Sequence, residues 1–175
     1  FGIAIPQLQA DNALLKDRVF VDTLTQAYTR EYLAQRSALE MAQSRESGSS
    51  LYFVMFDLDK FKRINDELGH VDGDNALRRL SQVTKDIVRK ADVFARFGGD
   101  EFVLLLPNIS EQDALNLVER VRKGINAIVI SEVSLSSSFG VTLMQQNDTL
   151  ETLIQRADRA LYASKEKGGN TITLK

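Results

Sequence analysis

The sequence contains no cysteine in its 175 residues, which excludes a disulfide framework and a thiolate metal site. It also lacks a long apolar run, since the stretches 51–56 and 102–106 fall far short of the roughly 20 residues that span a bilayer. The chain starts at Phe1 without the basic start and apolar stretch of a signal peptide. These absences predict a soluble, cytoplasmic domain cut from a longer protein, with no membrane segment in this part.

The sequence also has no large excess of charge of one sign. Twenty-two basic residues stand against twenty-four acidic ones, for a net charge of −2, and no run of one sign forms a nucleic-acid-binding or membrane-binding patch. An anionic substrate must therefore be held by a local site. The length and the 43% hydrophobic content fit one compact domain.

Helix-like and strand-like segments alternate along the chain. Helical periodicity predicts helices at 29–46, at 74–90, from Ser110 onward, and at 150–167. Apolar and β-branched runs predict strands at 51–57, 93–97, 101–106, 133–143 and 171–174. The two strands around Gly98 and Gly99 form a predicted hairpin, because glycines tolerate the positive φ of tight turns.

The first 21 residues form a separate predicted segment. Leu8 and Leu15 lie one heptad apart, which is compatible with a linker helix that pairs with a second chain as a coiled coil, and equally with an ordinary surface helix. The domain proper is expected to cover residues 22–175.

Carboxylates cluster at two predicted strand ends. Asp57 and Asp59 stand at the carboxyl end of the strand at 51–57, and Asp100 and Glu101 lie at the tip of the hairpin. If strand and hairpin are neighbours, Asp57, Asp100 and Glu101 converge and supply the oxygen ligands that Mg²⁺ or Mn²⁺ prefers. Two such ions would serve phosphoryl chemistry. The alternative is that each acid is a solvated turn residue.

Five motifs in order resemble those of one family. The segment 96–102 (RFGGDEF) resembles the signature of GGDEF domains, and four further segments match that family: 22–25 (DTLT), 57–66 (DLDKFKRIND), 69–74 (GHVDGD) and 157–162 (ADRALY). The similarity runs from about Asp22 to the C-terminus.

The resemblance implies a diguanylate cyclase with an α/β (α+β) fold, a ferredoxin-like or palm-like, mostly antiparallel sheet flanked by helices. Two such domains would meet as a homodimer with one GTP on each. Each 3′-hydroxyl would attack the α-phosphate of the other GTP, giving cyclic di-GMP. An upstream sensory domain would regulate the reaction.

The resemblance also assigns roles to residues. Asp57, Asp100 and Glu101 would be catalytic, and the same three with the backbone of Leu58 would bind two Mg²⁺ or Mn²⁺ ions. The substrate-binding positions would be Phe61, Lys62, Asn65, Asp74, Gly98, Gly99 and Lys165, with Asn65 and Asp74 reading guanine. His70, the only histidine, is expected to be structural.

A second site is implied by Arg89 and Asp92, an R-x-x-D pair five residues before Gly98. In the family this spacing marks an inhibitory site for cyclic di-GMP, which Arg120 would join. Arginine suits it because its planar fork binds phosphate and stacks on guanine. The plainer interpretation is an i,i+3 ion pair on a helix.

Two departures from the family pattern stand out. Residues 26–31 (QAYTRE) replace the common G-L-x-N-R-R, and Gly169 stands where an arginine is frequent. Three rival hypotheses remain: a catalytically silent domain that senses cyclic di-GMP or GTP, another nucleotidyl transfer on the same fold, and a module that only dimerises.

Overall fold

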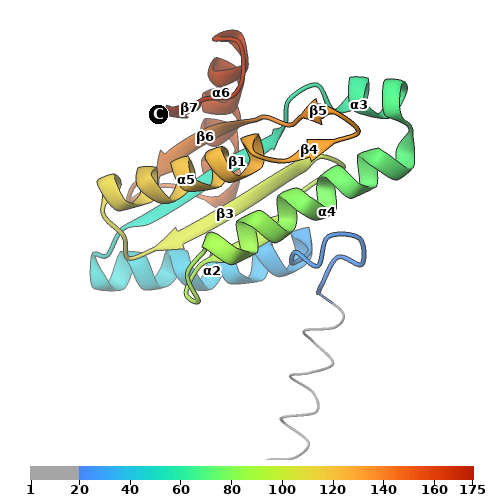
Figure 1. Cartoon of the computed structure of the whole chain (residues 1–175). Coiled ribbons are helices and arrows are strands. Elements are labelled where there is room, and N and C mark those ends of the chain that lie inside the picture. Colours follow the sequence, from blue (N-terminus) through green and yellow to red (C-terminus); the bar gives the residue numbers. More distant parts are fainter. Residues whose placement is uncertain (1–19) are drawn as a thin grey trace, which may run out of the picture.

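The structure is a computed structural model that describes residues 20–175, so the predicted linker helix falls almost wholly outside the described residues (Figure 1). The helices are α2 (Arg30–Ser47), α3 (Phe61–Leu68), α4 (His70–Ile87), α5 (Glu111–Asn126) and α6 (Leu150–Glu166). The strands are β1 (Leu51–Leu58), β2 (Val93–Arg96), β3 (Glu101–Pro107), β4 (Val129–Ile130), β5 (Val133–Ser134), β6 (Ser137–Leu143) and β7 (Ile172–Leu174).

One five-stranded sheet forms the centre, in the order β2-β3-β1-β6-β7. Only β6 and β7 pair in parallel, and the other neighbours are antiparallel. All eight residues of β1 are buried, as expected for an apolar run at the middle of a sheet that is covered on both faces. The predicted α+β, mostly antiparallel fold is confirmed.

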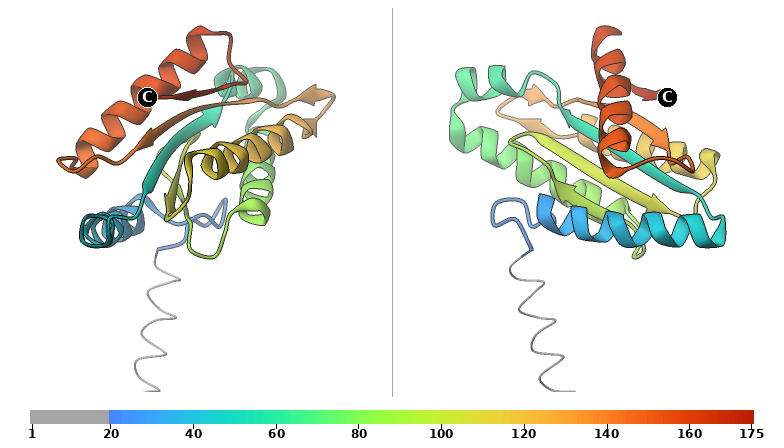
Figure 2. Two further views of the ribbon diagram at one scale, coloured as in Figure 1. Left: turned by 90° about the vertical axis from the view of Figure 1, so that its left-hand side faces the viewer. Right: turned by 180° about the vertical axis from the view of Figure 1, so that it is seen from behind.

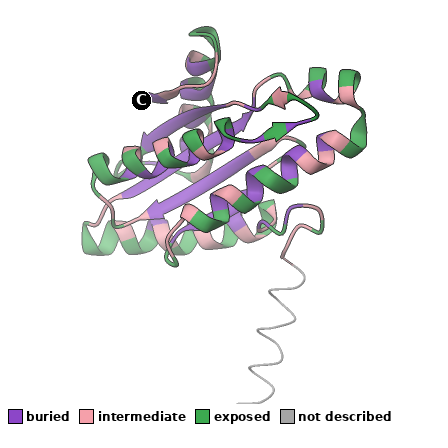
Figure 3. Cartoon of the chain, viewed as in Figure 1, coloured by how far each residue is buried: buried purple, intermediate pink, exposed green. Residues whose placement is uncertain are grey.

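The two faces of the sheet are covered by different helices (Figure 2). Because side chains alternate along a strand, Val54 and Phe56 pack with residues of α4 and α5, whereas Phe53 and Met55 pack with residues of α2 and α6. The strands are the most deeply buried part of the molecule (Figure 3). The carboxyl end of β1 thus leaves the core between α3 and the turn that follows α6.

Several predicted boundaries were wrong. The helix expected at 74–90 begins at His70, after Gly69 with a φ of 90°, and ends at Ile87 because Val88 is extended. The strand expected at 133–143 is divided in two: residues 133–134 pair with β4, and β6 begins at Ser137. Helix α3 and strand β4 were not predicted.

The other three predicted helix starts, at 29, 110 and 150, are correct within one residue. The side-chain oxygens of Thr29 and Ser110 accept hydrogen bonds from the backbone N–H of Tyr32 and Asp113, respectively. Thr149 and Thr152 form a reciprocal capping box at the start of α6. Among residues 20–175, no helix combines the length and apolar character needed to cross a membrane.

Candidate active site

The end of β1 and the start of β3 lie side by side in the sheet. Asp57 pairs directly with Glu101 in the antiparallel register. The backbone N–H of Phe97 donates to the carbonyl of Glu101 at 2.8 Å and closes the hairpin. The sequence-based condition that strand and hairpin be neighbours is therefore met, and the acidic residues of both segments meet at one edge.

The hairpin tip is held by an arginine rather than by unusual glycine conformations. Neither Gly98 nor Gly99 has a φ in the left-handed region, so the conformational reason that we expected for them is wrong. Instead, Arg96 donates to the carbonyl of Gly99 at 2.7 Å and forms an ion pair with Asp22 at 3.2 Å. An added Cβ at Gly99 would meet nothing within 4 Å, so open space surrounds the tip.

Asp57 and Lys165 form an ion pair, with 2.6 Å between the Lys165 Nζ and the Asp57 Oδ2. Asp57 is only 6% exposed. Burial raises its pKa to about 6, although Lys165 acts in the opposite direction, and the negative charges of Asp100 and Asp59 add to the rise. Burial alone would lower the pKa of Lys165, but the bond to Asp57 and the neighbouring carboxylates raise it overall.

Glu101 belongs to the same electrostatic cluster. Burial raises its pKa first, followed by the negative charges of Asp100 and Asp158, while Lys165 partly offsets them. Four predicted site residues from three elements, Asp57, Asp100, Glu101 and Lys165, are therefore coupled at one place. Asp158 of α6 joins them, although it was not among the site residues predicted from the sequence.

The carboxylate oxygens of these residues are suited to bind a divalent cation. Asp57 Oδ1 is buried and has no hydrogen-bond partner, which is costly for a carboxylate oxygen unless a ligand or ion completes it. Within residues 20–175, no three acidic or histidine side chains are close enough to form a closed cage. The residues that would hold an ion are Asp57, Asp100 and Glu101, with the carbonyl of Leu58.

A second group of predicted residues meets where α3 and α4 adjoin. A Cβ added to Gly73 would stand 1.9 Å from Oδ1 of Asn65 and 3.6 Å from the ring of Phe61. Gly73 therefore makes room for the Asn65 side chain, and Asp74 follows directly in the same helix. Lys62 is exposed on α3.

Arg89 and Asp92 are paired, but not on a helix. They lie in the turn after α4, where the Arg89 guanidinium donates to both oxygens of Asp92 and to the carbonyl of Pro107 at 2.7 Å. The Asp92 side chain is 0% exposed, so its oxygens face the protein. Arg120 is exposed on α5 and makes no hydrogen bond or ion pair with any described residue.

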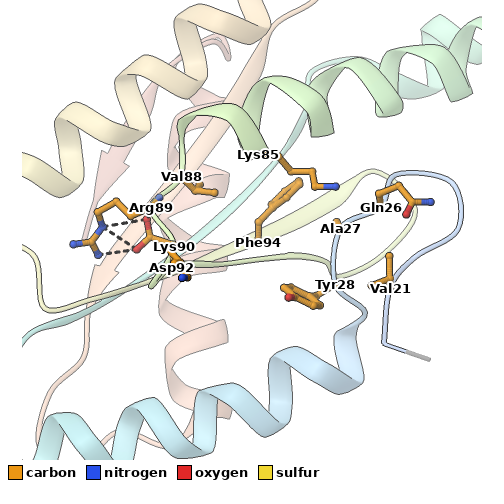
Figure 4. A pocket seen from close by; sticks show the side chains of 10 residues that line it. All are labelled: Val21, Gln26, Ala27, Tyr28, Lys85, Val88, Arg89, Lys90, Asp92 and Phe94. Atoms are coloured by element: carbon orange, nitrogen blue, oxygen red, sulfur yellow. Dashed lines mark hydrogen bonds and ion pairs between the residues drawn. The ribbon is translucent and has the colours of Figure 1, made fainter. Parts of the chain in front are cut away.

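A pocket of about 440 Å³ lies beside this turn. Figure 4 shows Arg89 and Asp92 facing each other at one end of the pocket, and Val21 and Gln26 at the other. The aromatic rings of Phe94 and Tyr28 lie between them. The Arg89 guanidinium is directed toward Asp92 rather than across the pocket.

The fold and the acidic edge define an α+β domain of the nucleotidyl cyclase type. Residues 19–171 match the family model described as "Diguanylate cyclase, GGDEF domain". The chain belongs to the GGDEF domain family.

Two curated relatives are named diguanylate cyclases. Diguanylate cyclase DosC of Escherichia coli (strain K12) is 37% identical over 164 residues, which cover 91% of this chain and 36% of that protein. Diguanylate cyclase DgcP of Pseudomonas aeruginosa is 37% identical over 157 residues, covering 87% of this chain and 23% of that protein. The chain therefore spans about a third or less of the length of these relatives.

Solved structures agree with the fold over nearly the whole chain. Diguanylate cyclase SiaD of P. aeruginosa, solved in complex with its activator SiaC, has a TM-score of 0.92 and 32% identity, covering 99% of this chain and 69% of that one. The coiled coil and GGDEF domain of DgcB from Caulobacter crescentus, solved with c-di-GMP, has a TM-score of 0.90, and at 23% identity with 99% and 95% coverage it supports the fold alone.

Proposed function

We propose that this domain is a diguanylate cyclase, which condenses two GTP molecules into cyclic di-GMP and two pyrophosphates. The observation that carries the proposal is the edge where buried Asp57, with one oxygen unpartnered, lies between Lys165 and the acids of the hairpin. The adjacent group of Phe61, Asn65 and Asp74 supplies the complement for a purine base. The names of the relatives support the same activity.

Different residues would bind the base, bind the triphosphate and accept the proton. Asn65 and Asp74 accept and donate along the guanine edge, and the ammonium groups of Lys165 and Lys62 attract the triphosphate. Bound Mg²⁺ or Mn²⁺, two per site, would neutralise phosphate charge and favour ionisation of the hydroxyl. Glu101, whose pKa is raised by burial and by Asp100, is suited to take the proton of the attacking 3′-hydroxyl.

The reaction needs two copies of the domain. The 3′-oxygen of one GTP bonds to the α-phosphorus of the other, the bond to pyrophosphate breaks, and the second half-reaction closes the ring. One protomer holds one GTP, so a homodimer with facing half-sites is required. The greater length of the relatives supports a further, upstream domain that controls this meeting.

Turnover of GTP with Mg²⁺ tests the proposal. Wild-type protein is expected to form cyclic di-GMP, and Asp100→Ala is expected to form none, while ATP gives no cyclic product. A wild type that binds GTP or cyclic di-GMP but forms no product, even when dimerised through a fused coiled coil, would instead identify a silent sensor. A wild type that binds neither nucleotide would indicate a domain that serves only to dimerise.

The proposal includes feedback by the product at Arg89 and Arg120. Because Asp92 is enclosed and already bonded to Arg89, the groups available to a phosphate are the remaining guanidinium edge of Arg89 and the exposed Arg120. Arg120→Ala is the cleaner test, since it leaves no buried carboxylate unpaired. Initial rates should stay unchanged while the product concentration for half-inhibition rises; an unchanged inhibition constant would contradict the site.

A further inference from the structure

Asp59 lies beside the site and accepts hydrogen bonds on both carboxylate oxygens, and the proposed function assigns it no role. Its Oδ1 accepts from the hydroxyl of Ser138 at 2.6 Å. Its Oδ2 accepts from the hydroxyl of Ser136 at 2.6 Å and from the backbone N–H of Asn170 at 2.8 Å. Its own N–H donates to the carbonyl of Ser136 at 2.9 Å. One side chain thus joins three segments that are far apart in the sequence.

Two of these segments adjoin residues of the candidate site. Asp59 directly follows Asp57 and Leu58, and Ser138 pairs with Asp57 in the sheet. Asn170 lies in the turn between α6 and β7, which begins just after Lys165. The bonds of Asp59 therefore fasten the end of β1 to the turn that follows Lys165.

The turn is packed tightly onto the Asp59 carboxylate. Gly169 has a φ of +78°, and a Cβ added there would stand 3.0 Å from Asp59 Oδ2. The N–H of Gly169 donates to the carbonyl of Ser164 at 3.1 Å, and that of Gly168 to the carbonyl of Lys165 at 3.0 Å. The turn is thus bound to the last turn of α6 at one side and to Asp59 at the other.

We propose that Asp59 is a positioning residue, which sets the distance between the Lys165 ammonium and the Asp57–Leu58 edge and so shapes the triphosphate site. This inference rests on the proposed function, because it concerns how the same site holds GTP. Without the Asp59 bonds, the turn 167–170 loses its connection to the end of β1, and the Asp57 ion pair alone then holds the Lys165 side chain at that edge. The effect should fall on GTP binding rather than on the chemical step.

The role depends on hydrogen bonds, and a conservative variant separates it from the role of charge. An asparagine can keep its Oδ1 toward the Asn170 N–H and the Ser136 hydroxyl, while its Nδ2 donates to the Ser138 oxygen. Asp59→Asn therefore keeps the connections and loses the charge. Asp59→Ala loses both.

The experiment compares KM for GTP and kcat in wild type, Asp59→Ala and Asp59→Asn. Asp59→Ala should raise KM roughly 10-fold with little change in kcat, as expected when a group that orients a binding residue is lost. Asp59→Asn should recover most of that loss. Exchange of the Asn170 amide hydrogen, followed by NMR, should be faster in Asp59→Ala and close to wild type in Asp59→Asn. The control is Asp86→Ala, because Asp86 is exposed on α4 and its side chain bonds, within residues 20–175, to Gln82 alone.

An Asp59→Ala variant with the wild-type KM would overturn the inference, and so would an Asp59→Asn variant impaired as much as Asp59→Ala. Equal melting temperatures of the two variants exclude misfolding as the cause of a difference between them. In these outcomes the wild type still turns over GTP. If the wild type itself neither binds nor converts GTP, the proposed function fails, and the inference fails with it.

Discussion

At the scale of single residues, Gly73 decides whether the Asn65 side chain can take the place that we propose for base binding. It is buried in the first half of α4, and the carboxamide of Asn65 occupies the place where its side chain would be. The glycine costs helix stability relative to alanine. Its value is therefore steric, because only a residue without Cβ leaves room for the Asn65 side chain against α4.

We expect Gly73→Ala to raise KM for GTP by roughly 10-fold to 100-fold, since the methyl group displaces Asn65 from the base. The measurement is steady-state kinetics of product formation. Gly124→Ala is the matched control: it also adds a methyl group to a helix interior, 2.5 Å from Val83 Cγ1. It should lower stability but leave KM unchanged, and equal KM values in both variants would contradict the role given to Gly73.

Which residues lie together could be predicted from the sequence, but not how they are bonded. The family resemblance named Asp57, Asp100, Glu101 and Lys165, and the structure brings them together. The Asp57–Lys165 contact depends on where the end of α6 lies over β1, which no local pattern encodes. The three bonds of Asp59 come from segments at positions 136, 138 and 170, so only the tertiary structure reveals them.

At the scale of elements, the start of α6 is fixed to the sheet by one carboxylate. Asp148 accepts from Arg156 at 2.6 Å and from the backbone N–H of Gln145 at 2.7 Å, and it is buried. The bond from Arg156 lowers the pKa of Asp148 to about 2, with further lowering by Gln145 and Thr152. Removing it leaves Arg156 without its ion-pair partner, and the guanidinium then bonds, among the described residues, only to Thr142 and to the carbonyl of Leu143.

Asp148→Ala should therefore lower the free energy of unfolding by about 2 kcal/mol, measured by urea denaturation at pH 7. Because the folded pKa lies below the unfolded one, the stabilisation is complete above about pH 4 and is lost as the pH falls toward 2. Wild type and variant should thus converge in stability over that range. A difference that stays constant down to pH 2 would contradict this assignment.

Long periodic helices and apolar strands could be predicted, and short elements could not. Helix α3 has eight residues with only Ile64 buried, and it starts after Lys60, which has a φ of 57° and makes no side-chain cap. Neither periodicity nor capping marks it. The strand expected at 133–143 is divided because Val133 and Ser134 pair with β4, which was not predicted. At the end of α4, the side chain of Asp92 accepts from the N–H of Arg89 at 2.7 Å.

At the scale of the whole molecule, the proposed reaction makes each chain depend on its partner. Product forms only when two competent half-sites meet. We expect a ninefold excess of Asp100→Ala to reduce product per wild-type chain to roughly one tenth, because most wild-type chains then pair with an inactive one. An equal excess of active Asp86→Ala should not inhibit. Undiminished activity in the presence of Asp100→Ala would argue against exchange between functional dimers.

The position of Asp57 on the central strand also determines how ligand binding affects the stability of the whole domain. The strand that carries it is paired with β3 on one side and β6 on the other, and its side chain is joined to the last helix. These contacts span more than a hundred residues of sequence, so the site forms only when the whole domain is folded. A ligand that binds this site therefore stabilises the folded state as a whole. Saturation at 100 times Kd should add about 2.7 kcal/mol to the free energy of unfolding.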